Sequence, residues 1–113
     1  MIDALGKLGV TGQRAQLPFR DASIWADLGT GSQLFVNAYP LGTVDRNFIV
    51  IDERQFAGIR VQHVRRPSYP DGTITNRFEC SGDEYWVRGA VPAGFDDIDA
   101  FAEGFISALA CSP

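Results

Sequence analysis

The sequence predicts an α+β domain with an antiparallel β-sheet of about six strands, built from three consecutive hairpins. A C-terminal α-helix packs on one face, and a short N-terminal helix precedes the sheet. Apolar and polar residues alternate in short runs between residues 22 and 91, which is the period of β-strands. After Gly94 the apolar residues recur at helical spacing instead. The 113 residues suit a single domain, divided into an N-terminal segment (1–20), the sheet (22–91) and the helix (96–110).

The N-terminal segment has the least regular pattern. Asp3 can cap a short helix that runs to Leu8, and Gly9 can stop that helix. A loop is then expected as far as Pro18. The segment has no positively charged start followed by an apolar stretch, so it is not expected to be a signal peptide.

The first two hairpins are predicted from alternation and turn residues. In the first, two alternating runs flank the turn 29–32, and Pro40 ends the second run. In the second, residues 47–53 lead through a short connection into a strand over 59–65. The stretch 66–72 contains two prolines and an Asp-Gly pair, which indicate a loop before the third hairpin.

The third hairpin is predicted from Thr73–Cys80 and Tyr85–Val91. A two-residue type II′ turn needs glycine at its first position, which Gly82 followed by Asp83 would supply. This turn fixes the register and gives one apolar face. The predicted pairs on that face are Cys80 with Tyr85, Phe78 with Val87, and Ile74 with Val91.

The C-terminal helix is predicted from its cap and its apolar stripe. Asp96 and Asp97 stand where an N-cap and the helix dipole favour carboxylates, and Asp99 has a capping-box-like position. These aspartates could also suggest a calcium or magnesium site, but they lack the D-x-D-x-D-G loop, so capping is the favoured interpretation. The apolar stripe is Ile98, Phe101, Phe105, Ala108 and Leu109.

The two cysteines are predicted to form a disulfide. Cys80 lies on the sheet face that the helix should cover, and Cys111 lies just past the last apolar position of the helix. A bond between them would place the protein in an oxidising compartment, as a secreted, lipoprotein-like or membrane-tethered domain whose signal or anchor lies outside this sequence. The alternative is two buried, reduced thiols in a cytoplasmic protein.

Charge and motifs exclude several function classes. A net charge of −4 argues against sequence-independent binding of nucleic acid or anionic membranes, and no apolar run is long enough to span a bilayer. His63 alone suits proton transfer near neutral pH, but no nucleophile motif accompanies it, so a surface or edge histidine is expected. We predict no metal site and no cofactor, because zinc-ligand spacing and phosphate-binding glycine motifs are absent.

The outer face of the predicted sheet is the candidate binding surface. Its register places Arg77 opposite Arg88 and Glu79 opposite Trp86. Aromatic residues with clustered arginine are typical of protein–protein hot spots. The full predicted site is Trp25, Phe35, Tyr39, Arg77, Trp86 and Arg88.

The alternative is that the N-terminal segment folds back over this face. Its apolar residues Ile2, Leu5, Leu8 and Phe19 would then form a second layer. We expect such a cover on the Trp25 side, because large exposed apolar patches are rare. Trp86 and the arginine pair are expected to stay exposed, since charged residues are seldom fully buried.

The leading hypothesis is a non-enzymatic extracytoplasmic binding or sensor domain that recognises a partner protein or a small ligand. One alternative is a small acidic intracellular inhibitor or immunity-type protein, whose charge would steer it to a basic target. Another is a carrier of a small apolar ligand held between sheet and helix. The cavity of such a carrier would be lined by Phe78, Val87, Phe101 and Phe105. The oligomeric state stays open.

Overall fold

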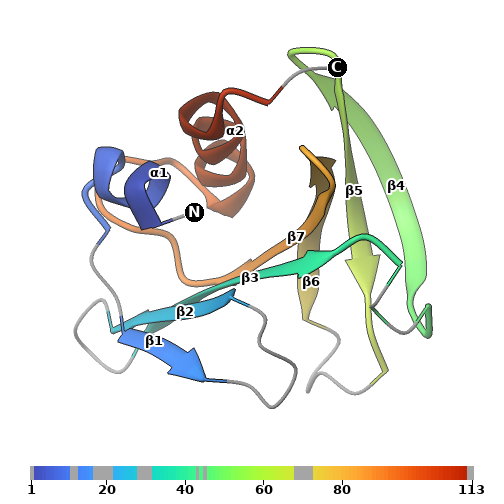
Figure 1. Ribbon diagram of the computed structural model, residues 1–113, viewed down its shortest axis with the longest axis horizontal. Coiled ribbons are helices and arrows are strands. Elements are labelled where there is room, and N and C mark those ends of the chain that lie inside the picture. Colours follow the sequence, from blue (N-terminus) through green and yellow to red (C-terminus); the bar gives the residue numbers. More distant parts are fainter. Residues whose placement is uncertain are drawn as a thin grey trace.

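The computed structural model describes most of the chain. The described residues are 2–10, 13–16, 22–27, 32–42, 44, 46–67 and 73–111; the side chains of residue 2 and of 13–16 and 22–27 are not described. Within this part, an antiparallel sheet curves around two helices that lie on the same face (Figure 1). The predicted α+β class is therefore confirmed.

Seven strands form the sheet, in the order β1-β2-β3-β7-β6-β5-β4, and five of them, β3 to β7, have described side chains. About six strands were predicted. The elements are α1 (Ile2–Lys7), β1 (Gln13–Gln16), β2 (Ala22–Asp27), β3 (Gln33–Pro40), β4 (Ile49–Phe56), β5 (Ile59–Arg65), β6 (Ile74–Cys80), β7 (Asp83–Gly89) and α2 (Ile98–Leu109).

The three predicted hairpins are confirmed as β2–β3, β4–β5 and β6–β7. The last hairpin lies between the other two, because β7 pairs with β3 and β6 pairs with β5. This order leaves β4 at one edge of the sheet and β1 at the other. The prediction of a loop over residues 13–16 is wrong, because this stretch forms β1 against β2. Its sequence, Gln-Arg-Ala-Gln, has no apolar alternation that could have indicated a strand.

The predicted register of the third hairpin is wrong by two residues. The turn consists of Ser81 and Gly82, both with positive φ (54° and 85°), as in a type I′ turn. Asp83 therefore belongs to the strand and pairs with Cys80. The observed apolar pair is Phe78 with Tyr85, and Asn76 faces Val87. Because the shift is an even number of residues, every side chain keeps the predicted face.

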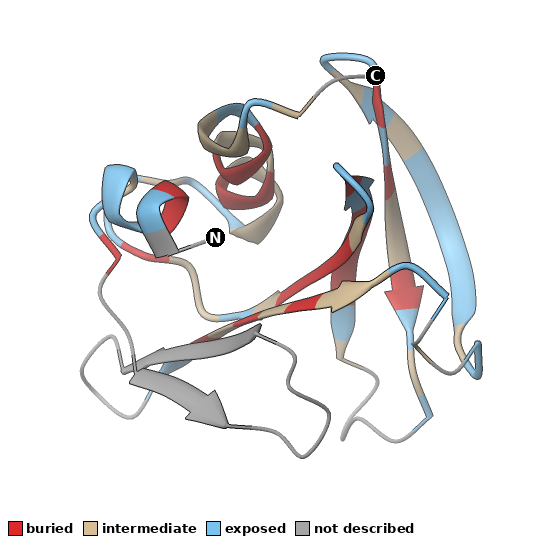
Figure 2. Cartoon of the chain, in the orientation of Figure 1, coloured by how far each residue is buried: buried red, intermediate tan, exposed pale blue. Residues whose placement is uncertain are grey.

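Helix α2 packs on the core face of the sheet. Its buried residues are Phe101, Ala102, Phe105 and Ile106. Figure 2 shows the buried part of α2 on the side of the helix toward β7. The ring of Phe105 lies edge-on to Phe78 and Tyr85, with ring centroids 6.1 and 5.5 Å apart. The four side chains that would line a carrier cavity are all fully buried in this one cluster.

The cap and the disulfide fix the two ends of α2. Asp97 is the N-cap, and its carboxylate accepts a hydrogen bond from the Ala100 N–H at 2.7 Å. The predicted capping by Asp97 is confirmed, whereas Asp99 reaches the sheet instead. The Cys80–Cys111 disulfide is confirmed, with an S–S distance of 2.15 Å and a Cα–Cα distance of 5.4 Å. None of the described helices is long and apolar enough to cross a membrane.

Candidate functional site

One row of the core face is polar. Asp52 of β4 pairs directly with His63 of β5, and His63 pairs with Asn76 of β6. Directly opposed residues point to the same side of a sheet, so these three side chains lie abreast beside the apolar core. The adjacent row continues the core with Val61 and Phe78. The polar row therefore interrupts an otherwise apolar surface where the first turn of α2 approaches it.

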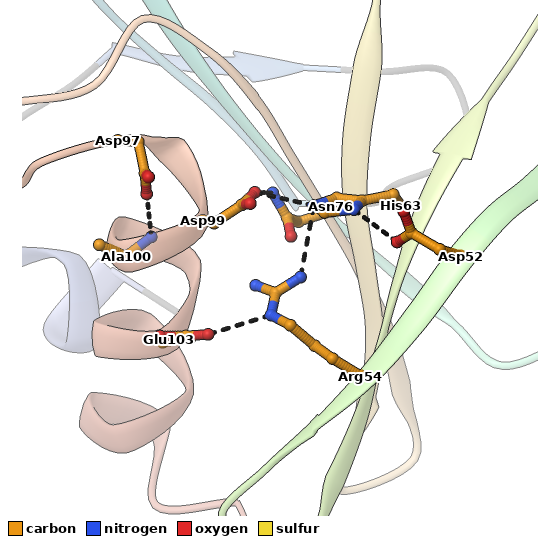
Figure 3. A network of polar contacts seen from close by, with 8 residues as sticks. All are labelled: Asp52, Arg54, His63, Asn76, Asp97, Asp99, Ala100 and Glu103. Carbon is orange, nitrogen blue, oxygen red and sulfur yellow. Dashed lines mark hydrogen bonds and ion pairs between the residues drawn. The ribbon is translucent and has the colours of Figure 1, made fainter.

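His63 lies between two carboxylates (Figure 3). Its Nδ1 is 2.6 Å from Asp52 Oδ1, and its Nε2 is 2.9 Å from Asp99 Oδ1. The same Asp99 oxygen accepts a hydrogen bond from Asn76 Nδ2 at 2.8 Å. An imidazolium satisfies this arrangement best, because both of its nitrogens are donors.

A second contact joins the same strand to the same helix. Arg54 Nε of β4 donates to Glu103 Oε2 of α2 at 3.0 Å. Glu103 lies four residues after Asp99, so both carboxylates project from one side of the helix. Arg54 Nη1 is also 3.4 Å from His63 Nε2. We name Asp52, Arg54, His63, Asn76, Asp99 and Glu103 the His63 cluster.

The carboxylates shift the pKa of His63 upward. Burial lowers this pKa, but the hydrogen bonds to Asp99 and Asp52 and the negative charges of both raise it by more, so the pKa of His63 lies above its ordinary value of 6.5. For the carboxyl group of Asp99, burial acts in the opposite direction and raises the pKa. The hydrogen bonds from Asn76 and His63, and the positive charges of His63 and Arg54, outweigh this effect, so the pKa of Asp99 lies below 3.8.

The expectation that His63 is an edge histidine is wrong, and its side chain is only partly exposed. It lies on β5, one strand inside the edge, and its side chain is only 21% exposed. His63 follows Val61 by two residues, so strand alternation could have placed its side chain on the core face. Its carboxylate partners are 11 and 36 residues away, so no local motif joined them.

The chemistry of this cluster favours a structural or switching role. Within the described residues, no group of three histidine, cysteine or acidic side chains could hold a metal ion. The two carboxylates address opposite nitrogens of the ring. Both ring nitrogens are thus engaged by carboxylates.

The outer face carries the predicted binding residues in an altered pairing. Arg77 pairs with Trp86 instead of Arg88, because of the register shift in the third hairpin. For the same reason Glu79 pairs with Glu84 and not with Trp86.

Trp86 and Arg77 are buried, with 1% and 5% of their surfaces exposed, so the expectation that they are accessible is wrong. Phe48, from the connection between β3 and β4, meets the Trp86 ring edge-on at 5.2 Å. The Arg66 guanidinium lies 4.8 Å from the centre of the Trp86 ring. Sequence periodicity assigned the face correctly, but it could not show which connecting segment covers it.

The buried carboxylate of Glu84 joins the buried side chains on the outer face of the sheet. Glu84 is fully buried, accepts a hydrogen bond from Trp86 Nε1 at 3.1 Å, and forms an ion pair with Arg77. Arg77 also donates to Gln62 at 2.9 Å and to Glu79 at 3.0 Å. Arg46 Nη1 lies 3.4 Å from the same Glu84 oxygen. We name Arg46, Phe48, Arg66, Arg77, Glu84 and Trp86 the Trp86 cluster.

The other predicted residues lie elsewhere on the outer face. Phe35 pairs with both Trp25 and Arg88, and Tyr39 pairs with Glu84. Phe35, Tyr39 and Arg88 are half-buried, and the Arg88 guanidinium lies 4.3 Å from the Phe35 ring centre. The Trp25 side chain lies outside the described part of the structure.

The N-terminal segment does not cover the outer face with its helix. Leu5 and Ala4 of α1 are buried in the main core beside α2, on the opposite side of the sheet. The expected second layer is therefore wrong for Leu5, and Leu8 also packs on the main core. Phe19 and the side chain of Ile2 lie outside the described residues.

An exposed aliphatic patch marks the edge strand. Three consecutive residues of β4 are exposed: Ile49 by 59%, Val50 by 43% and Ile51 by 46%. We call them the aliphatic edge. A bulge falls between Val50 and Asp52, next to the polar row. Exposed Ile74 of β6 shares the same row, since Ile49 and Ile74 both pair with Arg65. The continuous apolar run was visible in the sequence, but its place at an edge was not.

No protein-family model, curated protein or solved structure matches this chain. The site is therefore interpreted from its own geometry.

Proposed function

We propose that this chain is a non-enzymatic extracytoplasmic binding domain, stabilised by its disulfide, that captures an extended segment of a partner protein at β4. The single observation that carries the proposal is the aliphatic edge, Ile49 to Ile51. Strand β4 ends the order of the described strands, so one side of its backbone has no neighbour among them. A partner segment can add there as a further strand.

The exposure of these residues is unusual for such a position. An edge strand with contiguous aliphatic side chains invites association, and soluble proteins usually protect it with charges, proline or a bulge. Here Ile51 lies at a bulge and is followed by the acidic pair Asp52 and Glu53, whereas Ile49 and Val50 precede the bulge. The bulge and the acidic pair therefore limit the recognition surface to a short stretch of β4.

Charge complementarity favours a partner segment that combines aliphatic and basic residues. The side chains of Asp52 and Glu53 are 61% and 51% exposed directly after the aliphatic edge, although Asp52 contacts His63 and Glu53 forms an ion pair with Arg60 at 3.2 Å. A second copy of this chain would bring the same carboxylates to the contact, and each copy has a net charge of −4. Like charges oppose self-association, whereas a basic segment is attracted.

The compartment is inferred from the disulfide. Disulfides persist in oxidising environments and are rare in the cytoplasm. Protein isolated from its native host under denaturing, non-reducing conditions should show no titratable thiol from Cys80 or Cys111. Two titratable thiols would favour the acidic intracellular inhibitor instead.

Other function classes have less support. A carrier of apolar ligands needs open space, but Phe78, Phe101 and Phe105 are fully buried and pack in one cluster. Phe35, Tyr39 and Arg88 remain a second candidate contact surface, because they are half-buried rather than buried.

Strand addition can be tested with synthetic peptides and isotope-labelled protein. A short peptide that alternates valine and lysine should shift the backbone amide NMR signals of β4. A valine–glutamate peptide and a proline-interrupted peptide are the controls. Ile51→Lys should weaken binding of the basic peptide by about tenfold, or ~1.4 kcal/mol. The matched variant Leu41→Lys changes an equally exposed residue beside the β6–β7 turn and should have no effect. Equal binding of all three peptides would disprove the proposal.

A further inference from the structure

We infer that His63 is a proton-operated clamp: its protonated ring holds helix α2 to the edge hairpin β4–β5, and loss of one proton releases that contact. The inference concerns the chain alone. Its effect on partner capture rests on the proposed function at β4.

The clamp spans four elements. Asp52 comes from β4, His63 from β5, Asn76 from β6 and Asp99 from α2. Polar contacts join them in an unbroken series: Asp52 to His63, His63 to Asp99, and Asn76 to Asp99. The edge hairpin is therefore fastened to the N-terminal turn of α2 through the ring of one histidine.

The protonated ring fits this place and the neutral ring does not. When both nitrogens carry hydrogen, one donates to Asp52 and the other to Asp99. After loss of one proton, a nitrogen lone pair would face a carboxylate at 2.6 or 2.9 Å. An ionised carboxylate has no hydrogen to donate, so one of the two contacts must open.

Arg54 determines which contact opens. Its Nη1 is 3.4 Å from His63 Nε2, the nitrogen that faces Asp99. A neutral ring can keep its Nδ1 hydrogen bond to Asp52 and accept a hydrogen bond from Arg54 at Nε2. The His63–Asp99 contact is then lost, while Asp99 keeps Asn76. Deprotonation therefore breaks the His63 link between α2 and the edge hairpin, while the Arg54–Glu103 contact remains and β4 and β5 stay joined.

The charges around the ring favour the closed state. Asp52 and Arg54 face it from β4, Asp99 faces it from α2, and Asn76 of β6 is uncharged. Glu103 of α2 holds Arg54 from the other side. Three carboxylates thus surround two cationic side chains, so the cluster is negative overall even when His63 is protonated.

The pH window follows from the two shifted groups. The pKa of His63 is raised above 6.5, so its contribution is fully present below that value and is lost as pH rises through the raised pKa. The pKa of Asp99 is lowered below 3.8, so its contribution is present above that value and is lost as pH falls through the lowered pKa. The clamp is closed at mildly acidic pH.

The aliphatic edge lies beside this clamp. Ile51 immediately precedes Asp52 at the bulge. In the closed clamp the edge hairpin is held to α2 through both His63 and Arg54, whereas after proton loss only Arg54 holds it, so the closed state restricts the conformations of this part of β4 more. A preordered edge binds an added strand with a smaller loss of conformational entropy. Partner capture at β4 is therefore expected to be tighter at mildly acidic pH than at alkaline pH.

The clamp is tested first without any partner. His63 is the single histidine of the chain, so its ring signals in an NMR pH titration are assigned at once. The titration should give a pKa above 6.5, and Asp99→Asn should lower that pKa measurably. Asp96→Asn is the matched control, since Asp96 is an exposed aspartate of the same helix end. A His63 pKa at or below 6.5, or equal shifts in the two variants, would overturn the inference.

Amide hydrogen exchange then tests the release. After correction for intrinsic exchange, the amides of Ala100 and Phe101, which are hydrogen-bonded to Asp97 at the start of α2, should exchange several-fold faster at alkaline than at mildly acidic pH. His63→Gln should remove this difference, and the amides of β3 should not show it. Unchanged protection in the native chain would contradict the clamp. The valine–lysine peptide, measured at both pH values, tests the proposed function separately: pH-independent peptide binding with a normal His63 titration would refute only the coupling between them.

Discussion

Each face of the sheet carries a cluster of charged side chains, and the two clusters respond differently to their surroundings. The Trp86 cluster on the outer face centres on the ion pair of Arg77 and Glu84, which are both buried, and arginine side chains are not deprotonated in proteins. The His63 cluster on the core face centres on a ring that titrates near neutral pH and retains some exposure. Similar chemistry thus supplies a permanent support on one face and an adjustable contact on the other.

The largest expected effect comes from a substitution that disrupts the Trp86 cluster. Trp86→Ala should lower the free energy of unfolding by about 3–5 kcal/mol, because a fully buried ring leaves a cavity and strands its Glu84 partner. Urea unfolding monitored by far-UV circular dichroism measures the loss. Phe35→Ala, at a half-buried position on the same face, is the control and should lose clearly less. A Trp86 variant as stable as the native chain would return this residue to the predicted binding surface.

The disulfide extends the comparison to the two ends of α2. Replacing both Cys80 and Cys111 with serine should lower stability by about 3–4 kcal/mol, since the bond closes a loop with a sequence separation of 31. The loss should be the same at mildly acidic and alkaline pH, because serine does not titrate there. Chemical denaturation at the two pH values measures it. If the loss of stability varied strongly with pH, the disulfide-bonded end of α2 and the end that contacts His63 would be coupled.

The smallest expected effect concerns the core-face cluster. His63→Gln should lower stability by about 1 kcal/mol at mildly acidic pH, and the difference from the native chain should shrink as pH rises through the raised pKa of His63. Thermal unfolding across this range provides the measurement. A constant difference at every pH would mean that the ring acts through packing alone.

Local signals predicted most of the fold. The three hairpins, the Asp97 cap and the Cys80–Cys111 bond depend on alternation, turn residues and helix length, which are readable over short stretches. The register of the last hairpin was wrong because Ser81 adopts a positive φ that serine seldom shows. A turn with glycine at its first position was predicted instead, because glycine adopts a positive φ without steric strain.

The candidate sites were harder to predict because they are assembled across the sheet. The contact between His63 and Asp99 needs both the strand order and the helix direction, and neither is encoded in a short motif. The burial of Trp86 depends on Phe48, which lies in a connecting segment. The exposure of the aliphatic edge follows from the position of β4 at the end of the strand order.

The strand order also constrains when the molecule can fold. The final hairpin β6–β7 occupies the middle of the sheet and joins β3 to β5. Until the ribosome has released that last third of the chain, β3 and β5 each lack a neighbour and the main core cannot close. Such late, long-range pairing is slow compared with local folding. Cys80 lies on β6 and Cys111 follows α2, so the disulfide joins two segments that are both synthesised late.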